Sequence, residues 1–423
     1  MKALAAALLF APLLIPSPVH ALANRPAGSA GASAALEAGA PVSVARPAKE
    51  NDYSSLINLA EKGSPETRAQ AQFALINMGG RAVPDLLHAL DKREYIPQLV
   101  YVLNGIKDER SAKPLANLLN LKDKKSLESV KNALFSLGSH SVPYLFAAIE
   151  DPSRCQPAAE VLASVKAPEY REKLKNYLKD KQTYVRRAAA DVELSWLDPS
   201  ARADMEGLLG DKNVKIRRDA SAYFLAFAPN FSVKEIPALL KDPDAQVRRN
   251  SVQLATKLRD VKCFPILTKI LLNDPDPQVR ALSAEAVFRC NENGQATAPL
   301  IAALKDKDTS VAAAAARRLG ALKAAQALVP LQELLENKGK QSDDVVDAVA
   351  GALADIGMKF NANILLPYIN WNDLYVVRSV IRAWNISASP QDVKVKEALR
   401  NYIKMPVDDR YKNKVRTLLG KLG

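Results

Sequence analysis

Apolar residues recur along most of the chain at the spacing of amphipathic helices. Val247, Ser251, Leu254 and Leu258 stand at i, i+4, i+7 and i+11, which places them on one face of a helix. A second kind of apolar run opens on a proline, as in "VPDLLHAL" and "FPILTKIL". Proline suits the first turn of a helix because its missing N–H has no partner there. Strand patterns are nearly absent, so the pattern predicts an all-α chain built from two kinds of helix.

The two kinds of helix alternate with a constant period. An acid before a Val-Arg type step recurs at intervals of 31 or 32 residues, at Asp180, Asp211, Asp242, Asp274 and Asp306. The prolines form a second series, out of phase with the first, at Pro84, Pro114, Pro143, Pro237, Pro265, Pro299, Pro330 and Pro367. A unit of two helices cannot enclose a core alone, so neighbouring units must stack. We predict an α-solenoid of about twelve stacked antiparallel helix pairs, a superhelix over residues 51–423.

The Asp-Pro steps indicate where the first helix of each pair begins. Asp followed by Pro is typical of an N-cap followed by the first helical position. We therefore expect Asp242 and Pro243, and likewise Asp274 and Pro275, to start a helix.

The repeat "LLKDPDAQVRRNSVQLATKL" resembles HEAT repeats, in the short form found in phycobilisome-lyase-like proteins. An Asp and an Arg six residues apart do not meet within one helix, but stacking brings the Arg of one unit near the acid of its neighbour. The resemblance implies such a ladder, partly buried between repeats. Its members would be Asp180, Arg186, Asp211, Arg217, Asp242, Arg248, Asp274 and Arg280. Pro157 and Ala312 occupy the Arg position of their repeats, so the ladder should be interrupted there.

A second arginine follows the first in three consecutive repeats. Arg187, Arg218 and Arg249 recur every 31 residues, and position 281 is Ala. Three arginines in register are able to grip carboxylate or phosphate groups as a basic stripe. The alternative is a solvated helix face in a chain rich in Lys and Arg.

The chain begins with "MKALAAALLFAPLLIPSPVHALA". One Lys, a short apolar run, and small residues before the cut are typical of a signal peptide over 1–23, cleaved after Ala23. A spanning helix needs roughly 20 apolar residues, so we expect no transmembrane anchor after cleavage. Residues 24–50 are mostly Ala, Gly, Ser and Pro, which indicates a flexible spacer. The mature protein is therefore expected to be exported, either periplasmic or secreted.

Positive charge accumulates at the C-terminal end. The whole chain has a formal net charge of +13, and residues 394–423 hold nine Lys or Arg against Glu397, Asp408 and Asp409. A terminal repeat needs a polar outer face to remain soluble, so this end is interpreted as a basic cap. The alternative is a surface for an anionic envelope polymer or lipid, with Lys412, Lys414 and Arg416 as binding residues.

Cysteine and aromatic residues leave two further alternatives. Cys263 and Cys290 should approach each other across one repeat boundary, either as a disulfide in an oxidising compartment or as two buried thiols. Trp371, Tyr375 and Trp384 are spaced for helix packing, and we expect them in the core.

Residues that carry catalysis or bind metals are scarce. After the signal peptide, His88 and His140 are the only histidines, and they form no metal-ligand pattern with acids. Nucleophile motifs and phosphate loops are missing. The sequence therefore predicts no enzyme activity, no cofactor and no metal, and export argues against a nucleic-acid partner.

The function these observations favour is a non-enzymatic scaffold that binds another protein outside the cytoplasm. It would use an extended concave surface lined chiefly by the proline-led helices. One alternative is an envelope-associated module that binds anionic polymer or lipid through its basic C-terminal end. A minor alternative is a lyase-like HEAT enzyme, to which an exported chain has no obvious substrate access.

Overall fold

The computed structural model describes residues 53–92, 94, 96–228, 230, 234–291, 294–336, 341–369, 373–406 and 409–423. The expected signal peptide (1–23) and spacer (24–50) lie outside these residues. Every regular element in the described part is an α-helix or a 3-10 helix. The chain divides into two compact units, the first ending at Tyr223 and the second beginning at Phe224, so each unit is described by itself.

The first helix of each repeat, called an A helix, packs on the A helix of the next repeat within its unit. The A helices of unit 1 are α3 (Pro65–Met78), α5 (Ile96–Ile106), α7 (Lys124–Ser136), α9 (Cys155–Val165), α11 (Thr183–Trp196) and α13 (Val214–Phe227), in which the boundary between the units falls. Those of unit 2 are α15 (Ala245–Leu258), α17 (Pro277–Arg289), α19 (Thr309–Ala321), α21 (Asp343–Ile356), α22 (Leu374–Ser387) and α24 (Asp409–Leu422).

The second helix of each repeat, called a B helix, returns the chain to the next A helix. Unit 1 has α2 (Ser54–Lys62), α4 (Val83–Leu90), α6 (Ala112–Asn117), α8 (Val142–Ile149), α10 (Arg171–Leu178) and α12 (Arg202–Gly207). Unit 2 has α14 (Ile236–Leu239), α16 (Phe264–Asn273), α18 (Thr297–Ala303), α20 (Leu328–Glu336), the 3-10 helix η8 (Ala362–Tyr368) and α23 (Val393–Lys404). The predicted all-α solenoid of stacked helix pairs is confirmed.

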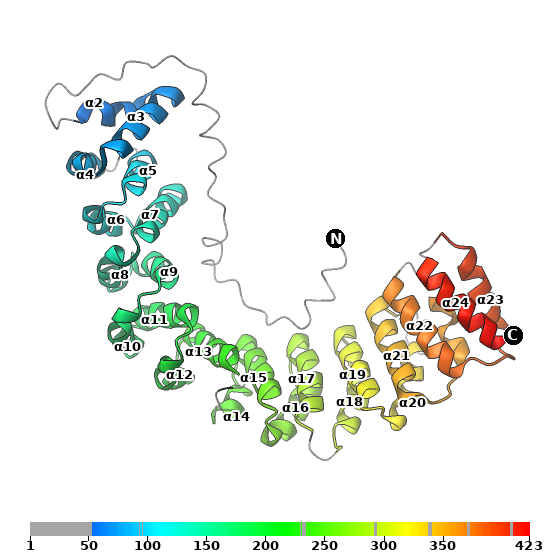
Figure 1. Cartoon of the computed structure of the whole chain (residues 1–423). Helices are drawn as coiled ribbons and strands as arrows, with labels where there is room; N and C mark the ends of the chain where they lie inside the picture. Colours follow the sequence, from blue (N-terminus) through cyan, green and yellow to red (C-terminus); the bar gives the residue numbers. More distant parts are fainter. Residues whose placement is uncertain are drawn as a thin grey trace. The chain divides into compact units, whose positions relative to one another are not determined.

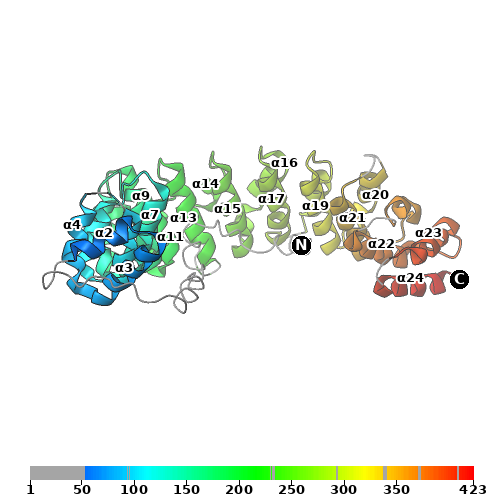
Figure 2. The same cartoon turned by 90° about the horizontal axis from the view of Figure 1, so that it is seen from above.

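The A helices, and not the proline-led B helices, line the inner side of unit 1. Figure 1 shows α5, α7, α9 and α11 on the inner side of the curve of this unit, with α4, α6, α8 and α10 on its outer side. In unit 2, α15, α17 and α19 follow one another as a layer (Figure 2). The expectation that B helices line the concave surface is therefore wrong for unit 1.

The A helices begin two or three residues later than the Asp-Pro steps suggest. In α15 the N-cap is Asp244, whose Oδ1 accepts hydrogen bonds from the backbone N–H groups of Gln246 and Val247. Asp242 instead accepts the N–H of Asp244 at 2.8 Å, which holds the turn that leads into the helix. Asp276 likewise caps α17. The assignment of Asp242-Pro243 and Asp274-Pro275 as helix starts was therefore wrong.

Prolines open several B helices as expected. Pro84, Pro143, Pro237 and Pro265 stand at the first or second position of α4, α8, α14 and α16. Each B helix turns a continuous apolar face toward its A helices. In α8, for example, five of eight residues are buried. Burial at this interface is the main favourable contribution to folding of a repeat.

The C-terminal aromatic residues have different environments. Trp384 is fully buried, and its Nε1–H donates to the carbonyl of Ala362 at 2.8 Å. Tyr375 is 53% exposed, because it lies in the first turn of α22, where it faces away from the core. The core prediction therefore holds for Trp384 and is wrong for Tyr375, and Trp371 lies outside the described residues.

Cys263 and Cys290 are both buried free thiols. The Sγ of Cys263 lies 3.4 Å from Oδ2 of Asp260, and that of Cys290 lies 3.5 Å from the carbonyl oxygen of Ala255. Burial raises the pKa of the Cys263 thiol to about 12 and that of Cys290 to about 11. Each sulfur thus faces an oxygen acceptor as a neutral thiol, and the disulfide alternative is not present in this structure.

Candidate functional site

The first arginine of a repeat binds the acid of the next repeat. In unit 1, Arg186 Nε lies 2.9 Å from Asp211 Oδ2. In unit 2 the contacts are bidentate: Arg248 reaches both carboxylate oxygens of Asp274 at 2.7 and 2.8 Å. Arg280 reaches those of Asp306 at 2.7 and 2.9 Å. Two parallel N–H···O bonds to one carboxylate are the strongest geometry available to a guanidinium group.

The same arginines also bind the backbone of their own repeat. Nη1 of Arg186, Arg217, Arg248 and Arg280 donates to the carbonyl oxygen of the acid six residues earlier, at 2.8, 2.9, 2.9 and 2.7 Å. That acid meanwhile accepts a backbone N–H two residues further on through its own Oδ1, as Asp211 does from Asn213 and Asp274 from Asp276. Arg186, Arg248 and Arg280 therefore each tie their own loop to the loop of the next repeat in the same unit.

The ladder is interrupted before Asp180. Asp180 accepts the N–H of Gln182, but no arginine pairs with its carboxylate in the part of the chain that the structure describes. The preceding repeat carries Pro157 at the position where such an arginine would stand. A proline offers no donor, so the absence follows from the sequence.

Burial makes these ion pairs costly to break. Arg248 is 8% exposed and Arg280 is 4% exposed. The hydrogen bond that Arg248 donates to Asp274 raises the pKa of Arg248, and the one that Arg280 donates to Asp306 raises the pKa of Arg280. Burial favours a higher pKa for Asp306, but the hydrogen bonds it accepts from Arg280 and Asp308 lower the pKa below its ordinary value. The pairs remain ionised, and their charges are unavailable to a ligand.

The second arginines do not form a free basic stripe. Arg187, Arg218 and Arg249 are all half-buried. Arg249 Nη2 lies 3.0 Å from Asp276 Oδ2, and its Nη1 donates to Gln246. The charge of Arg249 is thus balanced by the carboxylate that caps the next A helix.

Two acids of unit 1 lie with Arg187 on the A helices. Asp191 on α11 and Asp219 on α13 interact as like charges, and burial together with that repulsion raises the pKa of Asp219 above its ordinary range. Burial also raises the pKa of Asp191, against the opposing effects of Arg187 and a hydrogen bond from Gln156. Like charges held together retain a proton more strongly, so the pair is well suited to holding one proton.

A buried network links the loops of α10, α11 and α12. Arg171 lies 3.0 Å from Asp198, 3.4 Å from Glu193 and 3.6 Å from Asp204, and Lys179 lies 2.9 Å from Asp204. Glu193 is fully buried, and neither of its carboxylate oxygens has a hydrogen-bond partner among the described residues. Burial raises the pKa of Glu193 to about 7. When Glu193 is protonated, the two remaining carboxylates of the network are balanced by the charges of Arg171 and Lys179.

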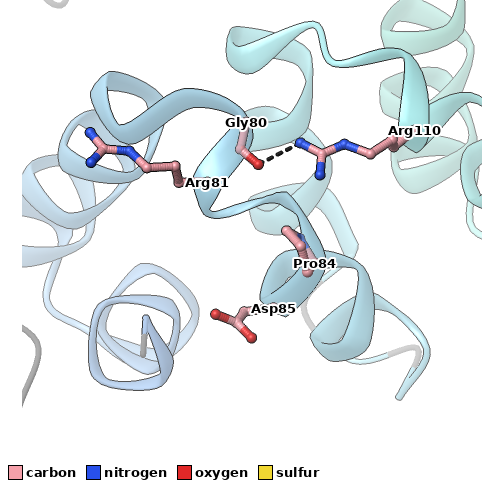
Figure 3. Close-up of a pocket in the computed structure, with 5 residues that line it drawn as sticks. All are labelled: Gly80, Arg81, Pro84, Asp85 and Arg110. Atoms are coloured by element: carbon pink, nitrogen blue, oxygen red, sulfur yellow. Dashed lines mark hydrogen bonds between the residues drawn. The ribbon is translucent and has the colours of Figure 1, made fainter. Parts of the chain in front are cut away.

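A surface hollow lies at the loop between α3 and α4. Gly80, Arg81, Pro84, Asp85 and Arg110 line an open depression of about 640 Å³. Figure 3 shows the Arg110 guanidinium directed at the carbonyl of Gly80, 2.5 Å away, and Arg81 directed away from it. Arg110 also binds both oxygens of Asp108. Because the charge of Arg110 is already neutralised by Asp108, we assign this arginine a structural role in the loop.

The basic C-terminal residues lie on the last helix. Lys414 and Arg416 are exposed and Lys412 is half-buried. Arg416 donates to Asn413 at 2.6 Å, and the ammonium of Lys414 lies 5.5 Å from the centre of the Tyr411 ring. None of these three makes an ion pair within the described residues, so their charges face solvent.

Groups for metal binding are sparse in the described part of the chain. His140 lies 3.2 Å from Glu109, and both side chains are largely exposed. No cluster of three or more His, Cys, Asp or Glu residues is arranged to hold a metal ion in the ranges the structure describes. No described helix has both the length and the apolar character needed to cross a bilayer.

Three exposed aromatic residues of unit 1 were not predicted from the sequence. They lie on the A layer, which is the layer formed by the A helices. Phe73, Tyr101 and Phe135 lie on α3, α5 and α7 and are 58%, 57% and 40% exposed. Their spacing does not follow the period of the ladder. In the sequence, each of these residues is an aromatic residue at a helical position outside the apolar stripe. Its exposure becomes clear only when the direction of that helix face is known.

The family comparison agrees with the observed helix pairs. Residues 265–342 and 297–385 match the model of a family described as HEAT repeats. Curated proteins include no match to the chain.

Three solved structures are similar to this chain at low identity. An engineered protein from the Northeast Structural Genomics Consortium is 16% identical, with 88% of this chain and 99% of that chain covered and a TM-score of 0.41. YibA of Escherichia coli is 19% identical, with 62% and 98% covered and a TM-score of 0.46. A structure of Kap95p with RanGDP is 11% identical, with 87% and 57% covered and a TM-score of 0.49.

The Glu193 network predicts a pH-dependent stability. A carboxyl whose pKa rises from 4.5 to about 7 on folding stabilises the folded state below pH 4.5, and this contribution is lost as pH rises through 7. The loss is on the order of 3 kcal/mol. Glu193→Gln should therefore reduce the fall in unfolding free energy between pH 4.5 and 8, measured by urea denaturation.

Glu172 supplies the control for this experiment, since it is an exposed acid on the same segment of the chain. Glu172→Gln should retain the pH dependence of the original protein. An identical pH dependence in Glu193→Gln and the original protein would contradict the assignment.

Proposed function

We propose that this chain, which contains HEAT repeats over residues 265–385, is a non-enzymatic scaffold that binds a partner protein outside the cytoplasm. The observation that carries the proposal is that repeating residues join the repeats, whereas non-repeating residues are exposed on the A helices. The repeating arginines and acids are buried between repeats. The exposed faces of the A helices carry side chains that differ from repeat to repeat.

The A layer has the chemistry expected of a protein interface. Aromatic side chains on α3, α5 and α7 are followed by paired charges on α7 and α9, where Lys131 lies 2.8 Å from Glu160. Protein interfaces typically combine an apolar, aromatic centre with a polar rim. A stable interface buries about 800 Å² on each partner, an area that several adjacent A helices supply together.

The acids and bases of the A layer support binding rather than catalysis. Arg249 is held by Asp276, and Lys131 is held by Glu128 and Glu160. A general base or nucleophile needs a free partner within hydrogen-bond reach of a substrate. Groups that already neutralise one another instead supply fixed, complementary charge. Export of the scaffold rests on the signal-peptide pattern of residues 1–23.

A second candidate function is binding of an anionic envelope polymer or lipid through the C-terminal end. The solvent-facing charges of Lys414 and Arg416, together with half-buried Lys412, favour it. Such attraction is long-ranged and weakens as salt screens it.

Site-specific photocrosslinking tests the scaffold function. A photoreactive residue placed on the A layer, at Arg382 on α22, should crosslink one specific protein in producing cells. The same residue placed at Val329, which is 58% exposed on the B helix α20, should not. Equal labelling from both layers, or no protein adduct from the A layer, would rule out the scaffold.

Vesicle binding tests the second function separately. The triple variant Lys412→Glu, Lys414→Glu, Arg416→Glu should lose salt-sensitive binding to vesicles that contain phosphatidylglycerol, if that function is correct. Binding that is unchanged by the triple substitution and by 0.5 M salt, at which the screening length is roughly half its physiological value, contradicts an electrostatic surface. Neither result alters the crosslinking outcome at Arg382.

A further inference from the structure

Three exposed aromatic residues of unit 1 lie on neighbouring A helices. Phe73, Tyr101 and Phe135 are called the aromatic strip. They lie on three successive A helices, and α3 packs on α5 as α5 packs on α7. Large aromatic side chains that remain more than one-third exposed on adjacent elements are a mark of an interaction site.

The packing of α3 on α5 places Phe73 and Tyr101 near one point of contact between the helices. A Cβ atom on Gly105 would lie 2.6 Å from Cδ1 of Ile76, so the two helices approach each other closely there. Phe73 lies three residues before Ile76, and Tyr101 lies four residues before Gly105. Because α4 reverses the chain between them, α3 and α5 run in the same direction. Each ring therefore lies about one helical turn from the same contact point.

Each of the three helices also carries an asparagine beside its aromatic residue. The pairs are Phe73 with Asn77, Tyr101 with Asn104, and Asn132 with Phe135. Residues three or four positions apart share one face of a helix. A side-chain amide offers both donors and an acceptor, which suits it to the N–H and C=O groups of a peptide backbone. Asn77 and Asn132 are exposed, whereas Oδ1 of Asn104 is buried. Exposed amides therefore flank the strip on α3 and α7.

The strip lacks charge near its centre. Helix α5 contains no charged residue, and α3 contains none after Arg68. Charges begin at α7, where Lys131 is already bound by Glu128 and Glu160. A charged ligand segment on α3 and α5 would lose water without gaining a counter-charge, which is unfavourable. The strip therefore fits an uncharged ligand, although the whole chain carries a net charge of +13.

The typical spacing of packed helices fits one backbone conformation of a ligand. Packed helices lie about 8–10 Å apart. A polyproline II helix rises 3.1 Å per residue with three residues per turn, so equivalent side chains recur about every 9 Å. Its backbone has no internal hydrogen bonds, which leaves the peptide groups open to asparagine. Proline-rich segments are commonly recognised by surfaces lined with aromatic residues.

We propose that the aromatic strip binds an extended, uncharged, proline-containing peptide segment of the partner protein. Rings on successive A helices contact every third side chain of the segment, and the exposed amides of Asn77 and Asn132 bind its backbone. This inference rests on the scaffold function and locates the centre of its binding surface.

Fluorescence anisotropy with labelled synthetic peptides tests the proposal on the full chain. The probes are a twelve-residue peptide of Pro, Val, Ala and Ser, the same peptide with each Pro replaced by Ala, and an acidic version with Ser replaced by Asp. The uncharged proline peptide should bind most tightly. The double variant Phe73→Ala, Tyr101→Ala should weaken this binding by about tenfold or more, as expected for residues at the centre of an interface.

Tyr144 provides the matched control, because it is a 37% exposed aromatic residue on the B helix α8 of the same unit. Tyr144→Ala should leave binding of the proline peptide unchanged, and thermal melting should show that all variants are folded. Tighter binding of the acidic peptide, or equal affinity in the double variant and Tyr144→Ala, would overturn the proposal.

Crosslinking separates this inference from the scaffold function. A photoreactive residue at position 73 should label the partner protein; labelling of the chain's own residues 24–52 would instead identify an internal occupant and overturn the proposal. If the partner still crosslinks from Arg382 with undiminished yield in the double variant, the location is wrong while the scaffold function stands. If the proline peptide binds but no partner protein is crosslinked, the scaffold function fails.

Discussion

The arginine that joins successive repeats is the contact on which the rest of each unit depends. Its guanidinium group binds two things at once, the carbonyl groups of its own loop and the carboxylate of the next loop. The acid in turn holds the turn that leads into its own A helix. One side chain thereby fixes the loop, the start of the helix and the distance to the next repeat. Removal of one partner would leave a buried charge unpaired, which typically costs 3–5 kcal/mol.

This use of charge explains why function must lie elsewhere. The ladder residues recur at the same position because each repeat packs on its neighbour in the same way. Their burial keeps them from contacting ligands. Half-buried groups on the A layer, such as Arg249 and Asp276, balance one another. The aromatic strip breaks the pattern, because Phe73, Tyr101 and Phe135 remain 40–58% exposed and do not follow the period of the ladder. We therefore place recognition on the A layer of unit 1.

The period of the sequence was sufficient to predict the helix pairs and their stacking. It also indicated that an acid and an arginine from different repeats would meet, since a separation of six residues excludes a contact within one helix. It could not distinguish Asp242 from Asp244 as the N-cap. Both acids precede the helix, and only the geometry of the loop shows which carboxylate reaches Gln246 and Val247.

Exposure was the other property that the sequence could not supply. A helical repeat shows which residues share a face, but the direction of that face depends on how neighbouring helices pack. For this reason the sequence wrongly predicts Tyr375 in the core and the proline-led helices on the inner surface of unit 1. It also leaves open whether Arg249 is a free cation. Phe73 and Tyr101 were overlooked for the same reason, since apolar residues in a helix are most simply interpreted as core.

Arg248 and Asp274 stabilise the fold by direct coupling between repeats. A double-mutant cycle measures this coupling: Arg248→Ala, Asp274→Ala and the double variant are compared with the original protein by urea denaturation. The effects of the two single substitutions should be far from additive, with a coupling energy of about 1.5 kcal/mol or more. Additivity within about 0.5 kcal/mol would show that the two side chains act independently, which would contradict a direct coupling between the repeats.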